Sequence, residues 1–170
     1  RKGALIVVDL GSDLRPEDFL YSGIKIEAKL STDLLINLFA TDTPLHDGAV
    51  LVKGNKIISA GVILPLSRQG ISRYGTRHLA ALGITERFDR CICIVVSEET
   101  GTLSLANQGK LERPITSSRL QELLIKLVGN QNTSGTPKSS SNKTNSYQKT
   151  NTNDTITVEK KLDKQNTIQD

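Results

Sequence analysis

The stretch Ala4-Leu5-Ile6-Val7-Val8 is entirely apolar, and Cys91-Ile92-Cys93-Ile94-Val95-Val96 has the same character much later in the chain. A short continuous apolar run is typical of a strand covered on both faces, because a half-exposed strand alternates apolar and polar residues. We therefore expect both runs to lie in a sheet on which helices pack. This is the pattern of an α/β or mixed α+β domain.

The segments around these two runs alternate between strand and helix signals. Residues 24–30 alternate with period two, as in a half-buried strand, and Ser31 is placed to cap a helix with an apolar face. Gly54-Asn55 separates two apolar runs and is a hairpin signal. Further strands are predicted at residues 49–52, 56–64 and 102–105, and further helices near 78–82 and from 118 onward. Together they form a central mixed sheet of about six strands with helices packed on it.

The composition changes sharply after Val128. Residues 129–170 consist mainly of Asn, Thr, Ser, Gln and Lys, and such a segment cannot bury enough apolar surface to offset the entropy of ordering it. We therefore expect a folded domain at residues 1–128 and a disordered polar tail at residues 129–170.

The net charge of +4 is spread evenly, because six Lys and four acidic residues leave +2 in the tail and +2 in the rest. A nucleic-acid groove concentrates its positive charge and stacks bases on aromatic rings, whereas this chain has only three Tyr and three Phe. Nucleic acid is therefore not an expected partner.

Cysteine occurs only at Cys91 and Cys93. Two cysteines in one strand are too few for a disulfide scaffold, and no second cluster completes a zinc site. We interpret them as core residues in a reducing compartment, which favours the cytoplasm. No run approaches the roughly 20 apolar residues of a membrane-spanning helix. Because the chain begins at Arg1 and contains no Met, we expect it to be a fragment or a processed form of a longer protein.

Three polar clusters lie where predicted elements begin or end: Thr43-Pro44-Leu45-His46-Asp47-Gly48-Ala49, Gly75-Thr76-Arg77-His78 and Ser97-Glu98-Glu99-Thr100-Gly101. The second, at a helix N-terminus, suits a polyphosphate, and the third could hold a divalent cation. Each also has an ordinary interpretation, namely an Asp-Gly turn, a capped helix with a surface Arg, and solvated turn residues. Both histidines of the chain fall inside these clusters, which favours a functional site.

Together the three clusters resemble the motifs of diadenylate cyclases, which make cyclic di-AMP from two ATP molecules. Residues 43–50 are similar to the family's Asp-Gly-Ala motif, residues 75–84 to its Arg-His-Arg motif, and residues 95–101 to a third stretch. The order and spacing agree, and the resemblance covers nearly all of residues 1–128. One position departs from the pattern, because Leu79 replaces the second Arg of Arg-His-Arg. That Arg would either face the phosphates or pack against a neighbouring element.

The resemblance implies a catalytic arrangement in which each protomer binds one ATP and two protomers meet face to face. Each 3′-hydroxyl then attacks the α-phosphorus of the opposite ATP. Asp47 would polarise the 3′-hydroxyl or accept its proton, while Gly48 and Ala49 would let the ribose approach the backbone. Such a transfer depends mainly on positioning and charge stabilisation.

The resemblance also assigns the remaining ligands. Thr76, Arg77 and His78 would grip the phosphates, with Arg77 and His78 in the catalytic set beside Asp47. Ser97 would contact ATP, and Leu64 would contact adenine or serve as an ordinary core residue.

A divalent metal, Mn²⁺ or Mg²⁺, would be held by His46 and Glu98 together with phosphate oxygens, and the nitrogen ligand favours Mn²⁺. Members of the membrane-anchored branch carry helices ahead of this domain, so the full-length protein is expected to be tethered while this domain is cytoplasmic. The alternative function is a catalytically weakened nucleotide-binding module of the same fold.

Overall fold

The structure is a computed structural model that describes residues 2–69 and 71–129. The predicted tail lies outside the described residues, apart from Gly129, which ends the last helix. The elements are β1 (Ala4–Asp9), the 3-10 helix η1 (Pro16–Asp18), β2 (Ile24–Lys29), α1 (Thr32–Leu38), β3 (Ala49–Lys53), β4 (Lys56–Val62), α2 (Thr76–Arg87), β5 (Cys91–Val96), β6 (Leu103–Asn107), β7 (Lys110–Ile115) and α3 (Ser117–Gly129). None of the described helices combines the length and the apolar character needed to cross a membrane.

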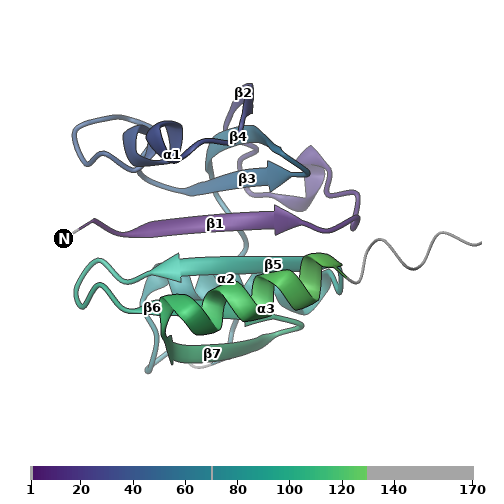
Figure 1. Cartoon of the computed structure of the whole chain (residues 1–170), viewed down its shortest axis with the longest axis vertical. Coiled ribbons are helices and arrows are strands. Elements are labelled where there is room, and N and C mark those ends of the chain that lie inside the picture. The colour runs from purple at the N-terminus through teal and green to yellow at the C-terminus, as the bar shows by residue number, and fades with distance from the viewer. Residues whose placement is uncertain (1, 70, 130–170) are drawn as a thin grey trace, which may run out of the picture. The chain divides into compact units, whose positions relative to one another are not determined.

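The strands form one mixed sheet of seven, in the order β2-β4-β3-β1-β5-β6-β7 (Figure 1). Helix α2 packs on one face, against β1 and β5 to β7, and α1 and α3 lie on the other face. The prediction for β1 is confirmed, because its odd residues Leu5 and Val7 join the core under α2 while Ala4 and Ile6 pack against the core around α1. This double coverage explains the unbroken apolar run.

Local sequence signals account for several boundaries. Ser31 caps α1 by accepting a hydrogen bond from the Leu34 N–H at 3.3 Å. The β3–β4 hairpin turns at Gly54, whose φ of +58° suits a residue without a Cβ. Cys91 and Cys93 are fully buried and unpaired, as predicted for core residues.

The seventh strand, β7, was not predicted. Its sequence Lys-Leu-Glu-Arg-Pro-Ile has no apolar run, and most of its residues are exposed. Pro114 lacks an N–H and is tolerated in a strand mainly at a sheet edge, which is where β7 lies. The other edge strand, β2, has a shift in register between Lys25 and Ala28.

Strand direction determines where the three motifs meet. β1 runs parallel to β3 and antiparallel to β5, with Ile6 opposite Val50 and Ala4 opposite Val96. The segment before β3 and the segment after β5 therefore lie at the same end of the sheet, on either side of the start of β1. The first motif precedes β3 and the third follows β5. Their residues are some fifty positions apart in the sequence, but only β1 lies between them, and neighbouring strands are about 5 Å apart.

Candidate active site

Two adjoining cavities occupy this end of the sheet. The smaller one, about 380 Å³, is lined by Leu5, His46, Asp47, Gly48, Val62, Ile63, Leu64, Leu66, Thr76, Arg77, Ala80 and Glu98. The larger one, about 470 Å³, is lined by Arg73, Gly75, Thr76, Arg77, His78, Val95, Val96, Ser97, Glu98, Glu99, Thr100 and Arg113. Three residues, Thr76, Arg77 and Glu98, belong to both. The cavities thus form one site with an apolar half and a charged half.

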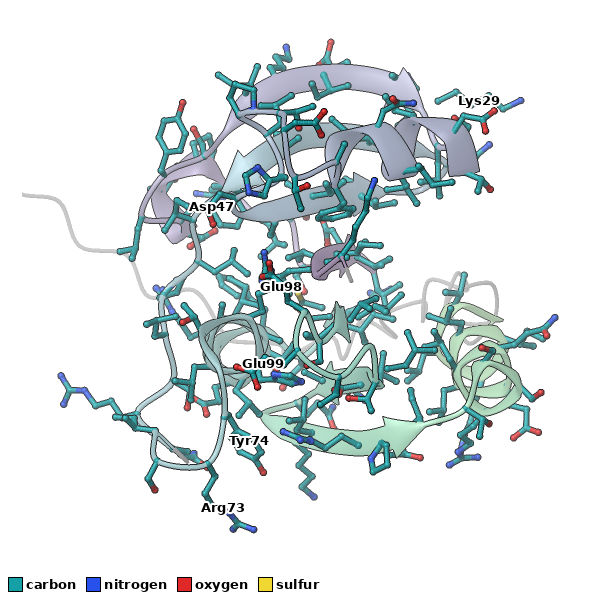
Figure 2. The ribbon with its side chains drawn as sticks, turned by 90° about the vertical axis from the view of Figure 1, so that its left-hand side faces the viewer. Lys29, Asp47, Arg73, Tyr74, Glu98 and Glu99 are labelled. Carbon is teal, nitrogen blue, oxygen red and sulfur yellow. The ribbon has the colours of Figure 1, made fainter. Side chains whose placement is uncertain are left out.

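The predicted site residues converge on these cavities with one exception. Asp47, His46 and Gly48 come from the loop before β3, while Thr76, Arg77 and His78 begin α2 and Ser97 and Glu98 follow β5. Figure 2 shows Asp47 and Glu98 on the same side of the molecule, with Glu99, Tyr74 and Arg73 below them. Ala49 is fully buried at the start of β3 and lines neither cavity, so its side chain packs in the core next to the loop.

Gly48 is required by the backbone. Its φ is +121°, and a Cβ at this position would lie 2.9 Å from the Gly61 Cα and 3.0 Å from the Val62 carbonyl oxygen. Both contacts are with backbone, which cannot move aside as a side chain can. The loop therefore passes directly over β4, and this close approach presents Asp47 to the smaller cavity.

The imidazole of His46 is oriented by the loop that carries it. Its Nδ1 is hydrogen-bonded to the carbonyl oxygen of Thr43, and because a carbonyl can only accept, Nδ1 carries the proton. In the neutral ring Nε2 then has its lone pair available. A histidine whose other ring nitrogen donates to a backbone carbonyl is the usual arrangement for a metal ligand.

Arg77 and Glu98 form the centre of the site. The Nη1 of Arg77 lies 2.6 Å from the Oε2 of Glu98, and the two side chains are 25% and 52% exposed. This hydrogen bond and the positive charge of Arg77 hold the pKa of the Glu98 carboxyl below its usual range, and a charge on His46 acts in the same direction. Glu98 is therefore a carboxylate at neutral pH, close enough to His46 to interact with it electrostatically.

Gly3 borders the Arg77–Glu98 pair, although no motif in the sequence marks it. A Cβ at this position would lie 2.7 Å from Arg77 Nη1 and 3.0 Å from the Glu98 Cβ. Gly3 precedes β1, the strand between the first and third motifs. Its missing side chain leaves the space in which the Arg77–Glu98 pair lies.

His78 lines the larger cavity but is only 6% exposed. Its Nε2 is 3.2 Å from the hydroxyl oxygen of Ser104, which is fully buried on β6. Burial, together with the charge of Arg113, lowers the pKa of the imidazole. His78 is thus a neutral residue tied to the core at neutral pH, and its direct contact with phosphate stays a prediction.

The position of Leu64 is consistent with either alternative left open by the sequence. It lines the smaller cavity beside Ile63 and Leu66, and at 2% exposure it also belongs to the core cluster under α2. Contact with an adenine ring and a packing role are therefore compatible.

Leu79 lies on α2, is 7% exposed and lines neither cavity. It therefore packs against the core, although its backbone carbonyl also accepts a hydrogen bond from the Ser67 N–H at 2.9 Å. The departure from the Arg-His-Arg pattern thus falls on a packing position and leaves Arg77 in the site.

Leu79→Arg is accordingly expected to raise kcat/KM for ATP by less than fivefold and to lower stability, since a charge would be placed among apolar neighbours. A loss of about 3 kcal/mol corresponds to a fall in Tm of the order of 10 °C for a domain of this size. Leu79→Met, which keeps an apolar side chain of similar volume, should preserve both quantities. A tenfold gain in kcat/KM in a variant of unchanged Tm would contradict the packing role.

Within residues 2–69 and 71–129, no three His, Cys, Asp or Glu side chains gather as a metal-binding group. A cation held by His46 and Glu98 would therefore take its other ligands from phosphate and water. The Nε2 of His46, which is unprotonated in the neutral ring, and the ionised Glu98 in the same cavity fit that role.

An apolar cavity joined to one rich in guanidinium and hydroxyl groups is suited to a nucleotide, with the base in the first and the phosphates in the second. Residues 1–111 match the family described as DisA bacterial checkpoint controller nucleotide-binding. The chain belongs to this family, the diadenylate cyclases.

Its relatives include a diadenylate cyclase of Listeria monocytogenes serotype 1/2a, which is 50% identical over 74% of this chain and 46% of that protein. The cyclic di-AMP synthase CdaA of Bacillus subtilis is 46% identical over 73% of this chain and 45% of that protein. The crystal structure of a DacA double mutant from Staphylococcus aureus has a TM-score of 0.67 and 40% identity, covering 75% of this chain and 84% of that one. The chain spans about half the length of the curated relatives it matches.

Proposed function

We propose that this domain is a diadenylate cyclase that condenses two ATP molecules into cyclic di-AMP and two pyrophosphates. The observation that carries the proposal is the joining of the two cavities at Thr76, Arg77 and Glu98. Adenine would occupy the smaller cavity against Ile63, Leu64 and Leu66. The triphosphate would then extend past Arg77 into the larger cavity, along the N-terminus of α2.

Each half-reaction forms one phosphodiester bond. The 3′-oxygen of one ATP bonds to the α-phosphorus of the other, the bond from that phosphorus to the bridging oxygen breaks, and pyrophosphate leaves with the electron pair. Asp47, exposed at the mouth of the smaller cavity, would take the hydroxyl proton. Arg77 would stabilise the charge that develops on the phosphates.

The residues also support a bound divalent cation, with Mn²⁺ favoured over Mg²⁺ by the nitrogen ligand. His46 and Glu98 would hold it, and when bound it would neutralise phosphate charge. Glu98 would then pair with the cation, and Arg77 would be available to contact the phosphates.

The proposal requires two protomers, because the reaction joins two ATP molecules and the family resemblance implies that each protomer binds one. Exposed apolar side chains at the mouth support such an encounter: Ile63 and Leu66 line the smaller cavity and are 40% and 51% exposed, and Tyr21, paired with Ile63, is 52% exposed. A face-to-face homodimer with twofold symmetry would place both sites equivalently. We further propose a cytoplasmic location for this domain and a membrane tether in the full-length protein, in keeping with its resemblance to the membrane-anchored branch.

The direct test is chromatography of the products after incubation with ATP and Mn²⁺. Cyclic di-AMP and pyrophosphate are expected in a ratio of one to two, from the stoichiometry of the proposed reaction. If the protein binds ATP reproducibly but forms neither product, it is the nucleotide-binding module instead. The proposed function would then be wrong.

A further inference from the structure

The larger cavity contains more positive charge than the Arg77–Glu98 pair accounts for. Arg73 and Arg113 also line it, and neither forms an ion pair with an acidic side chain within the part of the chain that the structure describes. Glu98 and Glu99 supply the carboxylates of the same cavity. Two guanidinium groups without an acidic partner, facing a hollow of about 470 Å³, are suited to an anion.

Of these two cations, Arg113 is the one with a fixed platform. Its Cζ lies 5.5 Å from the centre of the Tyr74 ring, within the range of a cation–π interaction. Tyr74 in turn lies beside His78, with ring centres 6.3 Å apart. His78 is hydrogen-bonded to the buried Ser104. Arg113 is therefore connected to the core through a series of ring and side-chain contacts, whereas Arg73 lies in the loop before α2.

The position of Arg113 also suits the far end of a nucleotide. It comes from β7 and lines the larger cavity, but not the smaller, apolar cavity that Asp47 lines. The charge of Arg113 reaches the neighbouring His78, whose pKa it helps to lower. A guanidinium in this position can form two parallel hydrogen bonds to a phosphate, which an ammonium cannot.

We propose that Arg113, held against the ring of Tyr74, is the second cation of the polyphosphate subsite and binds the β- and γ-phosphates of ATP and the departing pyrophosphate. This inference rests on the proposed function and adds a residue to it. Arg77 would act near the α-phosphate, where the bond breaks, and Arg113 at the leaving group. Tyr74 is then a positioning residue, since it acts through Arg113.

The test compares three ligands in calorimetric titrations with Mn²⁺ present: ATP, inorganic pyrophosphate and AMP. Arg113→Gln is expected to weaken the binding of ATP and pyrophosphate by about tenfold, because a charge-assisted contact is lost. AMP, which has no β- or γ-phosphate, should bind within about twofold of the unmodified protein. Equal weakening for AMP and ATP, or unchanged binding of pyrophosphate, would overturn the assignment.

Two controls separate this contact from general effects. Lys29→Gln removes the same charge from an exposed position at the upper right of Figure 2, across the view from Tyr74 and Glu99, and should leave all three affinities unchanged. Tyr74→Phe keeps the ring and should bind pyrophosphate normally, whereas Tyr74→Leu should weaken it severalfold. If both Tyr74 variants bind pyrophosphate as tightly as the unmodified protein, Tyr74 does not position Arg113.

The two proposals can fail separately. If the unmodified protein makes cyclic di-AMP but Arg113→Gln binds pyrophosphate normally, only the assignment of Arg113 is wrong. If the unmodified protein makes no cyclic di-AMP, the proposed function is wrong, whatever the titrations with Arg113→Gln show. A variant with a lowered Tm would be replaced by Arg113→Lys, which keeps the charge but loses the paired hydrogen bonds and should bind pyrophosphate with intermediate affinity.

Discussion

Asp47→Asn is expected to reduce the rate of cyclic di-AMP formation by at least about a hundredfold at saturating ATP and Mn²⁺, since general base catalysis contributes typically 10²–10⁴-fold. The amide has nearly the shape of the carboxylate but cannot accept the 3′-hydroxyl proton. Asp47 precedes Gly48, whose close approach to β4 fixes the loop. The substitution should therefore remove the chemistry without moving the backbone.

The binding of ATP separates loss of chemistry from loss of the site. Asp47→Asn should bind ATP at least as tightly as the unmodified protein, because it removes a negative charge near the nucleotide. Asp42→Asn makes the same chemical change at an exposed position of the same loop that lines neither cavity, and should keep full activity. Product formation by Asp47→Asn at the unmodified rate would show that Asp47 is not the base.

Activity per chain is expected to fall nearly in proportion to concentration once the protein is diluted below the dissociation constant of the dimer. In that range the fraction of chains in dimers is itself proportional to concentration, so a tenfold dilution should lower specific activity by about tenfold. The measurement is the initial rate of product formation, paired with light scattering or sedimentation at the same concentrations. Constant activity where only monomers are detected would rule out the two-protomer mechanism.

Mixed dimers provide a sharper version of the same test. If each Asp47 activates the 3′-hydroxyl of the ATP in its own protomer, a dimer of one unmodified and one Asp47→Asn chain can form only one of the two bonds. A linear dinucleotide that retains one triphosphate should then accumulate as the Asp47→Asn chain is added in excess. If the mixture instead yields only cyclic product, in an amount proportional to the fraction of unmodified homodimer, the two bonds are not formed independently.

The sequence predicted the central strands, and it marked polar residues that the structure brings together in two adjoining cavities, because both signals depend on local composition. The runs at Ala4 and Cys91 have to be apolar if helices cover both faces, and the three motifs have to carry polar residues where elements end. β7 was missed because an edge strand needs neither an apolar run nor a full set of backbone donors. The contact of Gly3 with the Arg77–Glu98 pair was also beyond prediction, since it depends on which strands are neighbours.

Long-range contacts account for the remaining site residues that the sequence did not reveal. Ser104 and Arg113 lie on β6 and β7 and have no motif around them. Their contacts with the site arise because the β6–β7 hairpin lies beside α2. This places Ser104 next to His78 and Arg113 next to Tyr74. For the same reason Leu79 left two interpretations open until its burial on α2 favoured packing.

If the domain binds ATP and a divalent cation as proposed, the ion pair between Arg77 and Glu98 would make the binding of each ligand depend on the other. Nucleotide alone would draw Arg77 away from Glu98 and leave the Glu98 carboxylate facing the phosphates. A cation alone would bind Glu98 and leave the guanidinium of Arg77 beside the positive charge of the cation. Only the two together would give each side chain a new partner of opposite charge, so each ligand would strengthen the binding of the other to the same extent. Because the pair is partly exposed, this reinforcement would be modest. It would favour the metal–nucleotide complex over either component alone.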